Sequence, residues 1–143
     1  MERKFILNFI KRHTIAVLST VTPQNTSESA VIHFAINDNF EIIFNTYVSY
    51  RKYKNLNHHN AVSVVIGWDE DITVQYEGKA QELQGKELVQ CKEIFHQYHP
   101  ISRKWDQSPE TRYFKVVPTW VRYSDLRGFE KRKVIEIGSF PLN

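Results

Sequence analysis

The spacing of apolar residues changes after the first dozen positions of the chain. Within residues 2–12 apolar side chains recur three and four positions apart, which predicts a short amphipathic helix. Residues 14–21 are apolar and β-branched, and the polar residues 22–25 that follow are typical of a turn. The chain is therefore expected to begin with a helix and to continue as a sheet.

Most of the remaining chain has the pattern of short strands separated by polar turns. Ile72, Val74 and Tyr76 alternate with polar residues, as expected for a strand buried on one face. Gly78 interrupts this alternation and predicts a bulge or bend. The further strands are predicted at residues 29–36, 41–46, 61–66, 72–83 and 113–117, with edge strands at 119–123 and 134–137.

Two further helices and one loop interrupt these strands. Ser49 is a suitable N-cap for a helix over residues 49–57, and an apolar stripe predicts a second helix over residues 85–98. Residues 99–110 carry two prolines among polar groups and are predicted to be a loop. The order of elements favours an α+β, mainly β fold: a six- to eight-stranded antiparallel barrel with two or three flanking helices. At 143 residues, we expect one domain over residues 1–143.

Charge and cysteine content narrow the classes of partner. The net charge is +3, and the basic pairs are scattered rather than gathered in one stripe, which does not favour nucleic acid. A small anionic ligand explains these pairs equally well. Cys91 is the single cysteine, so no intrachain disulfide is expected. No apolar run approaches the ~18 residues of a membrane span, and a cytoplasmic protein is the expectation.

The segment with the clearest chemical signal spans residues 44–52. Its strand ends at Thr46, Ser49 opens a helix, and Arg51 and Lys52 fall in the first helical turn. Cations are disfavoured there because a helix N-terminus already carries a partial positive charge. A bound phosphate would make the same arrangement favourable, since helix N–H groups, hydroxyls and cations would all contact it. Alternatively, both cationic side chains extend into water, and the residues alone leave the two interpretations open.

The same segment, FNTYVSYRK, resembles a motif of the pyridoxamine 5′-phosphate oxidase-like family of flavin-binding split barrels. The family motif is a strand ending in F-x-T followed by S-R-K at the start of a helix, and here Tyr50 is inserted before Arg51. The resemblance, closest to the small general-stress-protein-like members, extends over residues 8–125. Further matches follow in the family's order at residues 54–56, 74–80, 114–118 and 122–125.

This resemblance implies an α+β, mainly β split barrel that binds FMN and forms a homodimer with flavin sites at its interface. It places four residues along the flavin ring, namely Ala30, Val31, Ile32 and His33. It places four more at the ribityl phosphate, namely Thr46, Ser49, Arg51 and Lys52. Thr73 falls where the partner subunit reaches the flavin, and Trp105 falls where many small members place an aromatic ring.

Some of these residues have a simpler interpretation. Trp105 could anchor a loop over one end of the barrel, and His33 could be a surface or interface residue. Cys91, His96 and His99 resemble metal ligands in type, but positions five and eight apart on one helix do not converge, so no metal site is predicted.

The predicted function is that of an FMN-dependent oxidoreductase, which transfers hydride at the flavin to or from an unidentified small molecule. Vitamin B6 oxidation is not expected, because the family's namesake recognises that substrate partly through a longer C-terminal segment. One alternative is a non-catalytic module for flavin, haem or deazaflavin, in which the His33 or His96 region would supply an axial ligand to haem. A second alternative is a nucleic-acid-binding barrel, for which aromatic platforms interleaved with basic strands are not evident.

Overall fold

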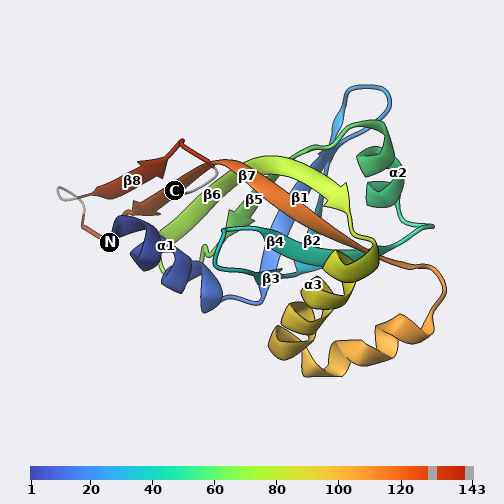
Figure 1. Cartoon of the computed structure of the whole chain (residues 1–143). Helices are drawn as coiled ribbons and strands as arrows, with labels where there is room; N and C mark the ends of the chain where they lie inside the picture. Colours follow the sequence, from blue (N-terminus) through green and yellow to red (C-terminus); the bar gives the residue numbers. More distant parts are fainter. Residues whose placement is uncertain (129–131, 141–143) are drawn as a thin grey trace.

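Eight antiparallel strands form one curled sheet in this computed structural model, which describes residues 1–128 and 132–140. Figure 1 shows three α-helices and one 3₁₀ helix around the sheet. The helices are α1 (Glu2–Lys11), α2 (Arg51–His58), α3 (Gly85–Tyr98) and the 3₁₀ helix η1 (Pro100–Gln107). The strands are β1 (Ile15–Val21), β2 (Ser27–His33), β3 (Ala35–Ile36), β4 (Ile42–Tyr47), β5 (Ala61–Ile66), β6 (Ile72–Glu82), β7 (Thr111–Asp125) and β8 (Lys133–Ile137).

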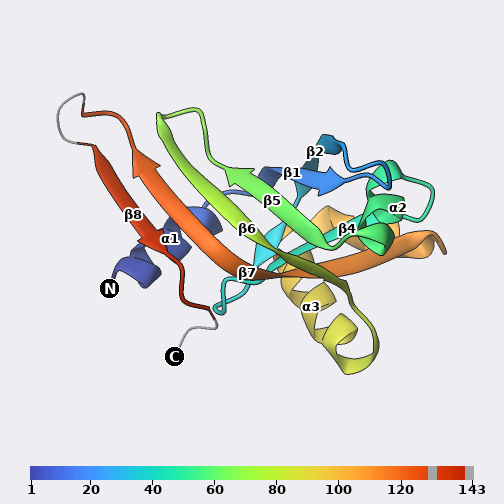
Figure 2. The ribbon, with the colours of Figure 1, turned by 90° about the horizontal axis from the view of Figure 1, so that it is seen from above.

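The sheet curls into a split barrel, as the sequence predicts. Its strand order is β2-β1-β5-β6-β7-β4-β3, with β8 added to the outer part of β7, and Figure 2 shows the curvature from above. Only Phe34 separates β2, which pairs with β1, from β3, which pairs with β4. A single strand was expected over residues 29–36. It divides because the buried Phe34 lies where the backbone changes from one partner strand to another.

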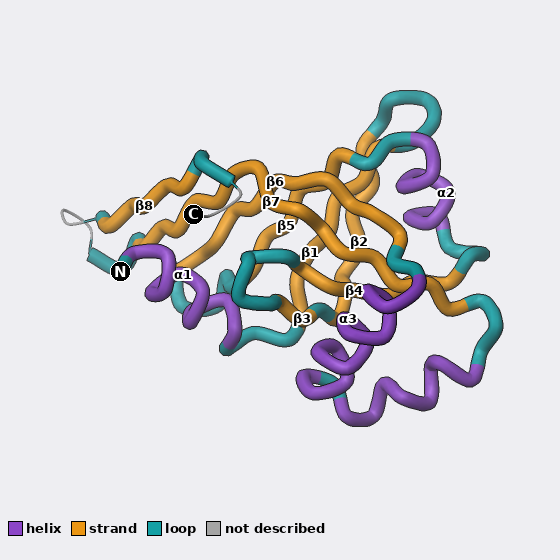
Figure 3. The backbone as a smooth tube through the Cα atoms, viewed as in Figure 1, coloured by secondary structure: helices purple, strands orange, loops and turns teal. Residues whose placement is uncertain are grey.

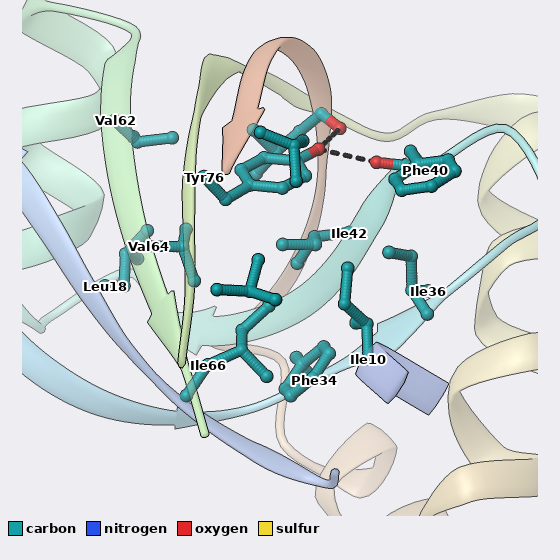
Figure 4. Packing of buried hydrophobic residues seen from close by; sticks show 14 of the residues in the cluster. Ile10, Leu18, Phe34, Ile36, Phe40, Ile42, Val62, Val64, Ile66 and Tyr76 are labelled. Carbon is teal, nitrogen blue, oxygen red and sulfur yellow. Dashed lines mark hydrogen bonds between the residues drawn. The ribbon is translucent and has the colours of Figure 1, made fainter. Parts of the chain in front are cut away.

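Aliphatic and aromatic side chains from every strand of the sheet fill the barrel interior. Figure 4 shows part of this packing. Ile6 and Ile10 of α1 are fully buried in this core, so the apolar face of the predicted helix packs against the barrel. Tyr76 is buried at the centre, and its hydroxyl lies 2.6 Å from the carbonyl oxygen of Phe40. A second cluster, around Phe95 and Tyr113, packs α3 and η1 against the outside of β3 and β4.

Strand β7 corrects the prediction of two strands separated at Pro118. It runs unbroken over residues 111–125 because its ladder with β6 is bulged there: Gly78 pairs with Pro118 and Glu77 with Trp120, which leaves Thr119 of β7 as the extra residue beside the proline. A proline has no N–H to donate, and bulges are positions where a sheet tolerates one. The bulge predicted at Gly78 is therefore confirmed, and it explains the continuity of β7.

Two local predictions on the helices are wrong. Residues 100–107, expected to be a loop, form η1, whose buried Ser102 is bonded to His96 and His99. Helix α2 begins at Arg51 with Tyr50 as its N-cap, so Ser49 is not the cap. The Ser49 hydroxyl instead donates to Glu110, which precedes β7. Among the described residues no helix is long and apolar enough to cross a membrane.

Candidate functional site

Two adjoining hollows are lined by residues of β2, of the end of β4 and of the start of α2. Figure 3 shows the course of the backbone through these elements. The first, which we call the Arg51 hollow, has a volume of about 320 Å³ and is lined chiefly by Glu28, Ser29, Ala30, Ser49, Arg51 and Lys52. The second, the Trp105 hollow, has a volume of about 280 Å³ and is lined chiefly by Val31, Ile32, His33, Thr46, Lys52 and Trp105. Tyr50 and Lys52 line both, so the two form one continuous depression.

Nine of the ten residues predicted for cofactor binding line these two hollows. The exception is Thr73, which lies on β6 opposite Ser124 of β7 and lines neither hollow. Residues 30–33 and 46–52 lie close together because β2 is at one edge of the curled sheet and β4 is next to the other edge. The sequence therefore predicted this cluster, and Thr73 is separate from it within one chain.

The two cations of α2 are in different environments. Arg51 is 76% exposed, and its Nη1 lies 2.6 Å from a carboxylate oxygen of Glu28. Lys52 is half-buried, with its Nζ 5.0 Å from the centre of the Tyr50 ring, and no described carboxylate pairs with it. Burial lowers the pKa of Lys52, because nothing in its surroundings compensates the lost hydration of the charge. An anion beside Lys52 would supply that compensation.

Thr46 carries a buried polar atom without a partner. The residue is 5% exposed, and its Oγ1 has no hydrogen-bond partner among the described atoms. An unpaired buried hydroxyl destabilises a fold by about 1–3 kcal/mol, so its presence needs an explanation, of which a bound ligand is one. Thr46 lines the Trp105 hollow together with Lys52, which places the unpaired hydroxyl and the unpaired cation at the same site.

An aromatic cluster forms one wall of the Trp105 hollow. His33 is exposed and points away from the buried neighbours Ile32 and Phe34, as the alternation of β2 predicts. Its ring centre lies 5.5 Å from Trp105 and 5.1 Å from His99. Trp105 also packs against the Phe95 cluster, so it both anchors η1 and lines the hollow. The two interpretations of Trp105 made from the sequence are compatible.

Comparison with known families identifies the chain. The sequence model described as pyridoxamine 5′-phosphate oxidase matches residues 3–125. The chain belongs to the pyridoxamine 5′-phosphate oxidase family. A comparison with curated proteins finds no match.

Solved structures related to this family member agree on the fold. General stress protein 26 from Bacillus anthracis is 20% identical with a TM-score of 0.72, and the match covers 96% of this chain and all of that one. The heme storage protein HutZ from Vibrio cholerae is 17% identical with a TM-score of 0.68, covering 80% of this chain and 88% of HutZ. A heme binding protein from Mycobacterium smegmatis is 13% identical with a TM-score of 0.76, covering 94% of this chain and 56% of that one.

Other reactive side chains of this pyridoxamine 5′-phosphate oxidase family member have structural roles. His96 is 4% exposed, and both of its ring nitrogens are engaged, one with Ser102 and the other with Asp106. Cys91 is buried in the same cluster, and burial raises the pKa of its thiol, so it is not an activated nucleophile. Neither residue lines the two hollows.

Sequence reasoning missed Glu28, which lines the Arg51 hollow, and the buried Asn55, which bonds to it from outside the lining. Glu28 accepts a hydrogen bond from Asn55, an amide of α2 that is 3% exposed. The two-residue period of β2 could have indicated that Glu28 points inward, because Glu28 shares a strand face with Ala30 and the buried Ile32. A charged residue near a strand end usually faces water, so this period alone did not distinguish Glu28.

Proposed function

We propose that this family member binds FMN in the continuous depression formed by the two hollows. Thr46, Ser49, Arg51 and Lys52 would hold the phosphate where the two hollows join, together with the N–H groups at the start of α2. The ring would lie along residues 30–33 in the Trp105 hollow. The observation that carries this proposal is the unpaired Thr46 hydroxyl beside the unpaired cation of Lys52. Each hollow is at or just below the usual size range of small-molecule sites, about 300–1,000 Å³, and the two together are within it.

We further propose a flavin-dependent oxidoreductase that acts on an unidentified small molecule. Bound FMN would supply the hydride chemistry. The protein's part would be to position the cofactor through β2 and α2 and to exclude water from the ring with Trp105. This division of labour agrees with the absence of a nucleophile paired with a base among the residues lining the hollows. The Cys91 thiol, buried away from both hollows, has no part in it.

The FMN proposal is tested by comparing FMN with riboflavin, which lacks the phosphate. The Arg51→Ala, Lys52→Ala double variant is expected to bind FMN more weakly by at least roughly a hundredfold, because charge-assisted hydrogen bonds contribute about 1.5–3 kcal/mol each. Riboflavin binding should hardly change. Quenching of flavin fluorescence on titration measures both affinities.

Lys54→Ala is the matched control for this comparison, since Lys54 is an exposed cation of α2 that lines neither hollow. Equal weakening of FMN and riboflavin by the double variant would indicate damage to the fold. Unchanged affinity for both ligands would mean that the two cations extend into solvent, and the proposed phosphate site would be wrong.

We also propose that two copies of the chain pair through the outer face of β1, β2 and β5. Val17 lies directly opposite Val31 on one side and Val65 on the other, which gives an apolar stripe across three strands. Val31 is 64% exposed and Val65 is 38% exposed. Contiguous exposed apolar side chains, unlike isolated ones, indicate an interaction surface. This stripe adjoins the ring-binding residues 30–33, so a partner seated on it would cover the flavin and bring in Thr73.

Sedimentation tests the dimer. The wild-type chain is expected to sediment as a dimer at micromolar concentration, and Val65→Asp is expected to give a monomer, because pairing would bury an unpaired carboxylate on each copy. Val89→Asp changes an exposed valine of α3 away from the stripe and should leave the dimer intact. A wild-type monomer that binds flavin fully would contradict the interface.

Haem is a second candidate ligand, because the side chain of His33 is available to coordinate iron. This side chain lines the Trp105 hollow and has no hydrogen-bond partner in the described part of the chain, whereas both nitrogens of His96 are engaged. Two proteins of similar fold are described as heme binding and heme storage proteins. A Soret band that is lost in His33→Ala would support haem, and a flavin absorption spectrum in the purified protein would support FMN.

A further inference from the structure

The Arg51 hollow contains a carboxylate that is fixed in position. One oxygen of Glu28 lies 2.6 Å from Nη1 of Arg51, and the other lies 2.8 Å from Nδ2 of Asn55. The Glu28 side chain is only 23% exposed, although it belongs to a strand near the surface. A negative charge therefore stands among the groups proposed to bind a phosphate.

The buried amide of Asn55 holds Glu28 in this place. Asn55 is 3% exposed, and its Nδ2 donates both to Glu28 and, at 3.0 Å, to Oγ1 of the buried Thr20. An amide nitrogen carries two hydrogens, so both are used. Because the anchoring amide is buried and both hydrogens of its nitrogen are used, moving the carboxylate away would leave a buried donor unpaired.

The contact between Glu28 and Arg51 is far more exposed to water than the contact between Glu28 and Asn55. It joins one nitrogen to one oxygen rather than pairing the two planar groups side by side, and Arg51 is mostly exposed to water. Exposed single-contact ion pairs are easily exchanged for another partner. A phosphate can therefore take Arg51 from Glu28, but it then lies next to a carboxylate that stays behind.

We propose that Glu28 is an internal competitor for the phosphate group and so sets how strongly the site distinguishes FMN from its unphosphorylated form. This inference rests on the proposed function. Glu28 offsets one of the two positive charges of Arg51 and Lys52 and repels an incoming dianion. The same carboxylate leaves neutral flavin unaffected. The site accordingly binds FMN less tightly than its cations alone would allow, and it releases FMN more readily.

The experiment replaces Glu28 by glutamine and measures the affinities for FMN and for riboflavin by fluorescence titration at fixed ionic strength. Glutamine keeps an oxygen that accepts from Asn55, removes the charge and places an NH2 group where the other oxygen faces Arg51. The expected result is FMN binding about tenfold tighter, a change of about 1.4 kcal/mol, with riboflavin binding unchanged. Glu93→Gln, which neutralises an exposed carboxylate of α3 outside both hollows, should change neither affinity.

Each other outcome overturns the inference in a distinct way. Weaker FMN binding with unchanged riboflavin binding would mean that Glu28 orients Arg51 rather than competing for it. An equal change for both flavins, or no change for either, would mean that Glu28 does not act on the phosphate. Wild-type protein that binds neither flavin would overturn the proposed function and this inference with it, whereas normal wild-type binding with an unchanged ratio in Glu28→Gln would overturn the inference alone.

Discussion

Replacing His96 by alanine is expected to lower the free energy of unfolding by about 3 kcal/mol, because it removes two hydrogen bonds of a side chain that is 4% exposed and leaves a cavity in its place. His96 joins α3 to η1 through two hydrogen bonds. Its Nδ1 lies 2.6 Å from the Ser102 hydroxyl, and its Nε2 lies 3.0 Å from the Asp106 carboxylate. Tyr113 of β7 donates to the other oxygen of Asp106 at 2.6 Å.

Hydrogen bonds from two neighbouring groups hold the ring of His96 in place. The Ser102 hydroxyl lies within hydrogen-bond distance of both Nδ1 of His96 and the carbonyl oxygen of His99, to which it donates. Burial opposes ionisation of Asp106, but hydrogen bonds from Tyr113 and His96 and the charge of Lys92 together lower the pKa of that carboxyl. Asp106 therefore accepts, and Nε2 donates. Removing the ring leaves Ser102 and Asp106 without this partner and opens a cavity between α3 and η1.

Urea denaturation of the full chain measures this loss, and His58→Ala provides the matched control at an exposed histidine. Because the folded-state pKa of Asp106 is lowered, its contribution is present above the ordinary aspartate pKa of about 3.9 and is lost as pH falls through the folded value. The difference between wild type and His96→Ala should therefore shrink as pH falls below about 4. A difference that is constant over this pH range would contradict a contribution from the hydrogen bond between His96 and the Asp106 carboxylate and would indicate lost packing alone.

How much of the fold the sequence predicts depends on whether each signal is local. The alternation around Val74 and Tyr76 records burial on one face of β6 directly, and both residues lie in the core. Helix η1 was missed because nothing within residues 99–110 repeats at a helical period. Its conformation depends instead on Ser102 and Trp105 packing against α3, which precedes it in the chain.

The same distinction holds for the candidate site. Arg51 and Lys52 could be recognised because two cations at a helix start conflict with the helix dipole, a conflict visible within a few residues. Glu28 could not, since its role follows from contacts with Arg51 and Asn55, more than twenty residues away. Thr73 lies outside the cluster, and its predicted role requires a second copy of the chain.

Substituting Gly78 by alanine is expected to lower the free energy of unfolding by about 3 kcal/mol, at the upper end of the usual cost of overpacking. A Cβ at this position would lie 2.5 Å from the carbonyl oxygen of Val117 and 2.7 Å from Cγ1 of Val116. The nearer of these atoms belongs to the backbone and cannot rotate away. The bulge would therefore have to open, and β6 would separate from β7 where Gly78 faces Pro118.

Urea denaturation of Gly78→Ala tests this expectation against Gly138→Ala, since a Cβ at Gly138 would meet no atom within 4 Å. The control should change stability by less than about 0.5 kcal/mol, as most surface substitutions do. Similar small changes in both variants would show that the β6–β7 ladder can open without cost at the bulge. In that case the close approach at Gly78 would not explain how β7 continues through Pro118. This continuity matters because β7 pairs with β4, beside the site, before Pro118 and with β8 after it.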